Sequence, residues 1–192
     1  MPFVLKVATK DFHPHDHISF DTSHPPPNNK AFEATVMAKN PRNQSQSEQL
    51  RLWPVHCVQG TPGAEIIPEI ETSRFHFVLE KGRDKRTEMF SGFADMFGNK
   101  SGVASLDLAA LLKQRGITHV YTVGLAGDYC VKRTAVDARK EGFEAFVIKE
   151  GTRSVDEGEN GWGAAMKEFQ AADVLVVSIN DAQVGRVMAF TP

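Results

Sequence analysis

The sequence predicts an α/β domain built around a parallel β-sheet. From residue 74 onward, short apolar runs typical of strands alternate with amphipathic segments typical of helices, which is the order expected of strands joined by crossover helices. In such a sheet, ligands bind beyond the carboxyl ends of the strands. Polar residues that could bind a ligand or take part in catalysis follow several of the predicted strands. The length favours one domain, which we expect to span residues 1–192.

Each predicted element has a local signal in the sequence. The first strand is an apolar run, FVLKVAT, that ends at a cluster of Asp and His, and the second, RFHFVLEKG, alternates before it becomes charged. The first helix has Ser105 as a candidate N-cap and Gly116 as its stop, and Gly142 ends the second helix. The predicted strands are 3–9, 74–82, 118–127, 144–152 and 174–179, and the predicted helices are 105–116, 130–142 and 161–173.

Residues 21–52 interrupt this regular order. They contain HPPPNN and NPRNQSQSEQ, which are polar and aperiodic, on either side of a short apolar patch, AFEATVMA. We therefore expect a long surface excursion in this part of the chain.

The composition excludes several classes of protein. The formal net charge of −2 at pH 7 gives no sign of a polyanion-binding surface, so we expect no nucleic-acid partner. No run approaches the roughly 20 apolar residues of a membrane span, and the N-terminus lacks the features of a signal peptide. The two cysteines, Cys57 and Cys130, lie far apart, which fits a reducing compartment better than a disulfide framework. We expect a cytoplasmic protein that is not secreted, with the nucleus or the peroxisome as alternatives.

The stretch DFHPHDH, which directly follows the first predicted strand, carries two Asp and three His. Asp11 and His13 are two residues apart, so in an extended segment their side chains point the same way and could reach one ion. Carboxylate and imidazole donors suit Zn²⁺, Fe²⁺ or Mn²⁺. His56, in the Pro- and Gly-rich stretch LWPVHCVQGTPGAE, is the best candidate for a third ligand, while His15 is expected to be exposed. The alternative is a polar loop whose histidines are only solvated.

Cys130 follows the predicted strand 118–127 and opens the helix CVKRTAVDARKEG. The partial positive charge and unpaired N–H groups of a helix N-terminus favour a thiolate, and N–H groups of the tight turn would stabilise an oxyanion. A reactive nucleophile and a buried structural cysteine fit this position about equally. Lys81, at the end of a strand, is either a solvated lysine or a cation that supports the thiolate. Cys57, beside His56, is expected to point away from the cluster as a packed core thiol.

Taken together, these motifs resemble the nicotinamidase/pyrazinamidase branch of the isochorismatase-like cysteine hydrolases, and the 21–52 excursion resembles its fungal, eukaryotic-type members. The matching stretches are ATKDFHPHDHISF, WPVHCVQGTPGAE, EKGRDK with EMFSGF, and VGLAGDYCVKRTAVDARKEGF, in the family's order and over nearly the whole chain. The resemblance implies a three-layer α/β/α fold with a mostly parallel sheet. It also implies an enzyme of NAD salvage that converts nicotinamide, and pyrazinamide-like amides, to nicotinate and ammonia.

The resemblance implies a metal centre that holds the substrate. Asp11, His13 and His56 would bind a divalent ion, with Zn²⁺ the first expectation and Fe²⁺ or Mn²⁺ as alternatives, and His17 would be a nearby or alternative ligand. The ion would bind the pyridine nitrogen of nicotinamide. Trp53 would stack on the pyridine ring.

The resemblance also implies a covalent mechanism at the other motif. Cys130 would attack the carboxamide carbon to form a thioester, Lys81 would support its thiolate, and water would then release nicotinate. The backbone N–H groups of Ala126 and Cys130 would form the oxyanion hole. Leu125 and Ala126 would contact the substrate at a cis peptide bond between them.

One part of the family pattern has no match in these 192 residues. The family's catalytic Asp ends a first strand upstream of the metal motif, and we expect that strand, its Asp and the first helix to be missing from this chain. Because the missing strand would lie mid-sheet, the strands at 3–9 and 118–124 would each keep an unpaired edge. No argument from the sequence makes Asp128, Asp84 or Asp16 a substitute base, and Asp128 is expected to cap backbone in its turn.

Two other functions stay open at this point. One is a catalytically silent short form that binds zinc and nicotinamide without turnover, and the other is a hydrolase of a different small amide. In each case the expected partner is a small molecule, without nucleic acid or membrane, and self-association into a homo-oligomer stays open.

Overall fold

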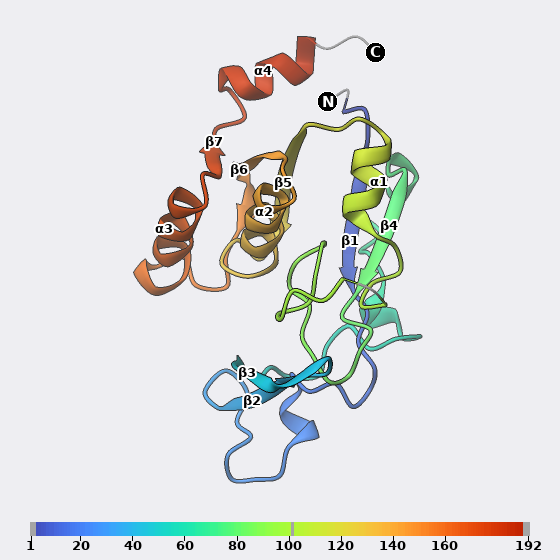
Figure 1. The fold of residues 1–192 in the computed structure, drawn as a ribbon, viewed down its shortest axis with the longest axis vertical. Coiled ribbons are helices and arrows are strands. Elements are labelled where there is room, and N and C mark those ends of the chain that lie inside the picture. The colour runs from blue at the N-terminus through green and yellow to red at the C-terminus, as the bar shows by residue number, and fades with distance from the viewer. Residues whose placement is uncertain (1–2, 101, 190–192) are drawn as a thin grey trace. The chain divides into compact units, whose positions relative to one another are not determined.

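The computed structural model describes residues 3–100 and 102–189 (Figure 1). The described chain divides into two compact units. The N-terminal unit contains Val7–Met89 and Ala94–Leu106, and the C-terminal unit contains residues 3–6, Phe90–Phe93 and 107–189. The expectation of one domain over residues 1–192 stays a prediction.

The N-terminal unit contains a two-stranded parallel sheet. β1 (Val7–Asp11) pairs with β4 (Phe77–Lys81), and the register ends with Asp11 opposite Lys81. Both strands begin later than their apolar runs predicted, and part of the second run is the 3-10 helix η3 (Thr72–Arg74). Within the described ranges, β1 has no other ladder partner. The register therefore sets a carboxylate and an ammonium side by side at the carboxyl end of the sheet.

The surface excursion expected at 21–52 contains a β-hairpin that the sequence did not predict. β2 (Thr35–Asn40) and β3 (Asn43–Arg51) pair antiparallel. Ala38 and Leu50 are buried, but most of the polar sequence NQSQSEQLR of β3 is exposed, so the alternation that normally indicates a strand is hidden. Two further 3-10 helices of this unit are η1 (Asp21–Ser23) and η2 (Pro62–Ala64).

The C-terminal unit has the predicted alternation of strands and helices. β5 (His119–Leu125), β6 (Glu144–Arg153) and β7 (Leu175–Val177) form a parallel sheet in that order, and β5 pairs only with β6 among the described residues. α2 (Cys130–Lys140) joins β5 to β6 and packs against both, with Ala135 fully buried. The other helices are α1 (Leu108–Gln114), the π-helical turn η4 (Glu159–Gly163), α3 (Ala164–Ala171) and α4 (Ala182–Ala189).

The expected N-cap of the first helix was wrong. Asp107, not Ser105, caps α1, because its carboxylate accepts a hydrogen bond of 2.9 Å from the backbone N–H of Ala110. The hydroxyl of Ser105 instead accepts a hydrogen bond of 2.9 Å from the backbone N–H of Glu80, at the end of β4. The role of this serine depends on a contact with a residue 25 positions away, which the local sequence pattern does not indicate.

The last helix was not predicted, yet it belongs to the core of its unit. Val184 of α4 is fully buried and clusters with Phe146, Ile148 and Val177 of the sheet, against which Tyr121 also packs. In the described part of the chain, no helix combines the length and the apolar character that crossing a membrane would require.

We predict that Asp95→Ala lowers the free energy of unfolding by about 2–3 kcal/mol. The buried carboxylate of Asp95 accepts hydrogen bonds from the backbone N–H groups of Phe97 (3.0 Å) and Asn99 (2.8 Å) and from the side chain of Asn99 (2.9 Å). The same Asn99 amide donates to Asn40 of the hairpin at 3.0 Å. The substitution leaves these donors without their acceptor, and urea unfolding followed by circular dichroism measures the loss.

Glu69→Ala is the matched control for this measurement. Glu69 is exposed, so its removal should change the free energy of unfolding by no more than about 0.5 kcal/mol. Equal effects of the two substitutions would contradict the role of Asp95.

Candidate active site

Three of the predicted metal ligands lie together in the N-terminal unit. Asp11 ends β1, His13 follows it by two residues, and His56 comes from the Pro-rich stretch after the hairpin. One potential ligand atom from each side chain lies within 4.8 Å of the others. His13 is buried, and Asp11 and His56 are half-buried. Two of the three side chains are therefore partly accessible to solvent.

Backbone carbonyls fix the orientation of both imidazoles. Nδ1 of His13 lies 2.9 Å from the carbonyl oxygen of Gly82, and Nδ1 of His56 lies 2.8 Å from that of Pro54. Since a carbonyl can only accept, the Nδ1 atoms carry the protons and the Nε2 lone pairs stay available. A hydrogen bond from the second ring nitrogen is the usual support of a metal-binding histidine.

The main chain binds the two ligand segments to each other. The backbone N–H of His13 donates to the carbonyl of Cys57 at 2.9 Å, and the backbone N–H of Gln59 donates to the carbonyl of His13 at 2.8 Å. The side-chain amide of Gln59 also donates to the carbonyl of Phe12 at 2.8 Å. These bonds explain how residues 43 apart in the sequence, His13 and His56, share one small region.

His17 lies beside the group rather than in it. It forms a second cluster with His13 and Glu88, and all three are buried. Its Nε2 must donate to the carbonyl of Thr87 at 3.1 Å, and its Nδ1 accepts from the hydroxyl of Ser19 at 2.7 Å. Burial lowers the pKa of His17 to about 4, so the ring is neutral at pH 7. Its ring packs on that of His13, with centroids 4.1 Å apart.

Lys81 pairs with Asp11 across the sheet. Its side chain is only 3% exposed, forms a salt bridge with Asp11, and donates to the carbonyl of Met89 at 3.0 Å. Burial alone would raise the pKa of Asp11, but the charge of Lys81 and its hydrogen bond lower it, and the net pKa lies below the ordinary value. Burial, followed by the Asp11 charge, raises the pKa of the Cys57 thiol. The carboxylate is therefore ionised, and the half-buried Cys57 thiol loses its proton less readily than a free cysteine does.

Trp53 lies beside His56 of the candidate metal-ligand group, which consists of Asp11, His13 and His56, and its stacking role stays a prediction. Its backbone N–H donates to the carbonyl of Ser19 at 2.8 Å, which ties it to the segment after the Asp/His cluster. Its ring makes edge contacts with those of His56 and Phe32, at centroid distances of 6.5 and 5.5 Å.

The predicted nucleophile lies in the C-terminal unit. β5 ends at Leu125, the peptide bond from Leu125 to Ala126 is cis, as the resemblance implied, and Cys130 is the first residue of α2. The backbone N–H groups of Tyr129 and Val131 both donate to the carbonyl of Ala126 at 3.0 Å, which closes the turn. The half-buried thiol of Cys130 is therefore set at the N-terminal end of an 11-residue helix.

Asp128 has a longer-range role than the expected capping of its own turn. Its buried carboxylate accepts hydrogen bonds of 3.0 Å from the backbone N–H groups of both Val155 and Asp156, in the segment after β6. It thereby holds that segment against the turn that precedes Cys130. The other two carboxylates considered as a base form salt bridges: Asp84 with Arg86, and Asp16 with Lys85.

Sequence reasoning missed the groups that orient these side chains. Gly82 had one visible signal, because it is a glycine directly after a strand. It has a φ of +70°, and its carbonyl oxygen orients the His13 ring. Ser19 and Thr87, which hold His17, and Pro54, which orients His56, act through partners that no local pattern indicates.

Several known proteins are similar to this chain in sequence and in structure. An isochorismatase domain model matches residues 24–181. The nicotinamidase of Schizosaccharomyces pombe is 38% identical over 179 residues, which cover 91% of this chain and 74% of that protein. A nicotinamidase/pyrazinamidase structure from Acinetobacter baumanii has a TM-score of 0.78 at 33% identity, covering 92% of this chain and 78% of that one.

A zinc complex is among the similar structures. It is the pyrazinamidase of Pyrococcus horikoshii, with a TM-score of 0.65 at 30% identity, covering 91% of this chain and 75% of that one. Together these matches confirm the predicted α/β fold class and the resemblance to nicotinamidases.

We predict that Gly82→Ala weakens zinc binding at least about tenfold. A Cβ atom at this position would lie 2.6 Å from Nδ1 of His13 and closer still to its Cε1, so the ring would be displaced from its carbonyl. Isothermal titration with zinc measures the effect.

Gly98→Ala separates this contact from backbone strain. Gly98 has a φ of +83°, so alanine is strained there too, but no heavy atom lies within 4 Å of the added Cβ. Gly98→Ala should lose stability and keep its zinc affinity, and equal losses of affinity in both variants would contradict the prediction.

Proposed function

The chain belongs to the isochorismatase family, and we propose that it hydrolyses nicotinamide and pyrazinamide-like amides to nicotinate and ammonia by metal-assisted attack of a cysteine. The observation that carries the proposal is the convergence of Asp11, His13 and His56, with both Nε2 atoms available. Similarity to nicotinamidases at up to 38% identity supports the substrate.

The donor set fits a divalent metal. One carboxylate and two neutral imidazoles form a common three-ligand set of catalytic zinc, which leaves a further position open for a substrate atom. The Asp11 carboxylate is ionised, as ligation requires. Zn²⁺ suits these donors, and Fe²⁺ or Mn²⁺ would also accept them. Bound there, the ion would supply a Lewis acid that takes up the pyridine nitrogen and fixes the ring.

The side chains around this point would hold the substrate. Trp53 would cover one face of the pyridine ring, because its indole lies at the edge of His56. His17 would keep His13 in place, since its neutral ring packs on His13 and both its nitrogens are bonded elsewhere. A ring fixed by its nitrogen and one face leaves the carboxamide in a defined direction.

Cys130 would carry the covalent step. Its sulfur attacks the carboxamide carbon, the thiol proton is passed to the leaving nitrogen, and ammonia departs to leave a thioester. Water then adds to the thioester carbon and releases nicotinate with the regenerated thiol. Backbone N–H groups of Ala126 and Cys130 would hold the developing oxyanion, and Lys81 would favour the thiolate. Leu125 would contact the amide beside Ala126.

We predict that Cys130→Ala abolishes ammonia release from nicotinamide, by at least about 10³-fold, and leaves zinc affinity unchanged. Cys57→Ser is the matched control, because burial raises the pKa of the Cys57 thiol and so disfavours the reactive thiolate. A colorimetric ammonia assay and zinc titration measure the two properties.

The same assay separates the proposal from the silent binding protein and from a different amidase. If Cys130→Ala released ammonia at the rate of the unchanged chain, the nucleophile would be wrongly assigned. Zinc and nicotinamide binding without turnover in the unchanged chain would identify a silent binding protein. A strong preference for an amide without a pyridine ring would point to the other substrate class.

We also predict that removing the metal with dipicolinate abolishes turnover and that zinc restores it. His56→Ala should bind zinc at least about tenfold more weakly and should need correspondingly more zinc to regain activity. His15→Ala is the control, since His15 is exposed and outside both His clusters. Full activity in the presence of the chelator, with metal content verified by elemental analysis, would contradict the role of the ion.

A further inference from the structure

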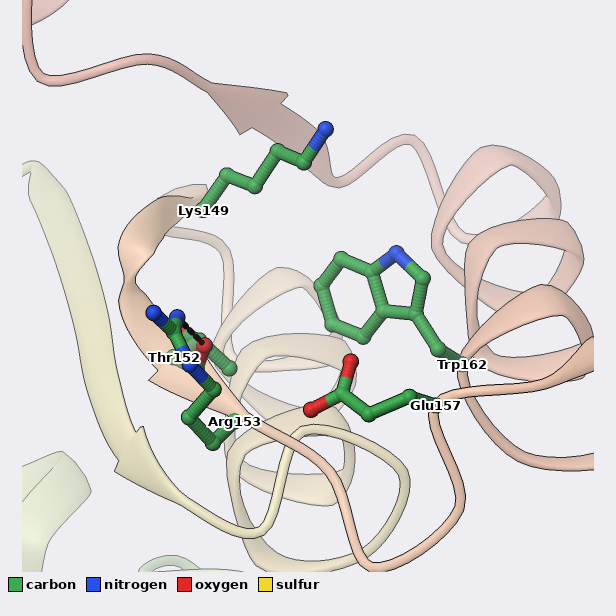
Figure 2. A pocket seen from close by; sticks show the side chains of 5 residues that line it. All are labelled: Lys149, Thr152, Arg153, Glu157 and Trp162. Carbon is green, nitrogen blue, oxygen red and sulfur yellow. Dashed lines mark hydrogen bonds between the residues drawn. The ribbon is translucent and has the colours of Figure 1, made fainter.

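We propose that the C-terminal unit carries a ligand site for a small planar aromatic carboxylate, in a pocket that none of the residues assigned above lines. The pocket has a volume of about 260 Å³ and is lined by Lys149, Thr152, Arg153, Glu157 and Trp162 (Figure 2). All five residues belong to the C-terminal unit. The proposal does not rest on the amidase assignment, because it concerns binding by this unit alone.

The pocket lies where β6 leaves its regular pairing. Thr122 of β5 is opposite Val147, but Gly124 is opposite Thr152, so residues 148–151 have no ladder partner in β5. β7 has already ended at this level, since Val177 is the last residue paired with β6. The result is a hollow beside the last residues of β6 and past the end of β7, close to the carboxyl ends of strands, near which ligands characteristically bind in open α/β sheets.

Two cations of β6 line one side of the hollow. The Arg153 guanidinium donates to the carbonyls of Thr152 at 2.7 Å and Glu150 at 3.4 Å, and neither Arg153 nor Lys149 forms a salt bridge within the described ranges. The nearby Glu150 carboxylate is held by Ser178 and by the backbone of Ile179. Glu157 is the carboxylate that lines the pocket with them, so positive charge exceeds negative charge there, which favours an anionic ligand.

Glu157 sets the direction of that ligand. Its carboxylate accepts a hydrogen bond of 2.8 Å from the backbone N–H of Ser154, which holds it in place. With one anion against two cations, the pocket keeps a positive balance concentrated at Lys149 and Arg153. The carboxylate of a ligand must therefore point to β6, away from Glu157.

Trp162 supplies an aromatic wall. It is presented by the π-helical turn η4, a rare conformation that is frequent at functional sites. The ring of Phe169 packs against its ring in an edge-to-face contact, with centroids 6.0 Å apart. Figure 2 shows the indole on the side of the pocket opposite Lys149, Thr152 and Arg153. An indole on the side opposite two cations complements a flat ring that bears a carboxylate.

The volume limits the ligand to about one ring. Sites for drug-sized molecules span roughly 300–1,000 Å³, and this pocket is slightly smaller than that range. A single aromatic ring with its carboxylate fits this description better than a nucleotide, which adds a sugar and a phosphate to its base.

The walls of the pocket also touch the turn that leads to Cys130. A Cβ atom on Gly127 would lie 2.8 Å from the indole of Trp162 and 3.0 Å from the methyl group of Thr152. The backbone N–H of Gly127 donates to the carbonyl of Arg153 at 2.8 Å. A ligand in the pocket would thus contact side chains that pack directly on this turn.

The fluorescence of Trp162 can report binding directly. The chain has two tryptophans, so Trp53→Phe leaves Trp162 as the only indole. In that background we expect benzoate, which lacks a pyridine nitrogen, to change the emission saturably. Benzamide, its neutral isostere, should bind about tenfold more weakly. Lys149→Gln and Arg153→Gln should each weaken benzoate binding about tenfold, as expected for the loss of a charge-assisted hydrogen bond.

Lys167→Gln is the matched control for the two charge substitutions. Lys167 lies on α3 in the same unit, is exposed and does not line the pocket, so benzoate affinity should stay within about twofold. Circular dichroism checks the fold of each variant. If Arg153→Gln does not fold, the benzoate affinities of Lys149→Gln and Lys167→Gln are compared instead.

Four results would overturn the proposal. They are no saturable change with benzoate up to about 10 mM, equal affinity for benzamide, an equal loss in Lys167→Gln, or tighter binding of inorganic phosphate than of benzoate. The last result would indicate a site for anions without an aromatic requirement.

Discussion

The parallel register of β1 and β4 is the constraint on which the metal-ligand group depends. It sets Asp11 opposite Lys81, so the residue after Lys81, Gly82, comes within reach of His13. Only glycine leaves room there, because a Cβ atom would overlap the imidazole. A shift of one residue in either strand would turn these side chains to the other face of the sheet. The chemistry of the group is thus decided by backbone pairing before any ion is bound.

The three histidines of this region show how hydrogen bonds divide their roles. His13 and His56 each give their Nδ1 proton to a carbonyl and keep one nitrogen available. His17 has both nitrogens engaged, and burial lowers its pKa to about 4, so it remains a neutral packing partner. Residue type and spacing could not distinguish these cases, because the difference lies in the partners of the second nitrogen.

The part of the fold that the sequence predicted is the part that depends on local pattern. The alternation of strands and helices from residue 74 and the start of α2 at Cys130 follow from apolar periodicity and turn residues. The β2–β3 hairpin was missed because its second strand is almost wholly polar. The roles of Ser105 and Asp128 were misjudged because their partners, Glu80 and the backbone after β6, are more than 20 residues away.

The two units would recognise related molecules by opposite features. In the proposed reaction the substrate is a neutral amide. The group around Asp11 could therefore hold it only through the nitrogen and the faces of the substrate's pyridine ring. The product is a carboxylate, and the pocket beside β6 offers Lys149 and Arg153 to that group. A site that prefers an aromatic acid to its amide distinguishes product from substrate by one charge. Since Trp162 and Thr152 also pack on Gly127, a bound acid would rest against the turn that positions Cys130. The contacts of Trp162 and Thr152 with this turn would then also respond to the accumulated product.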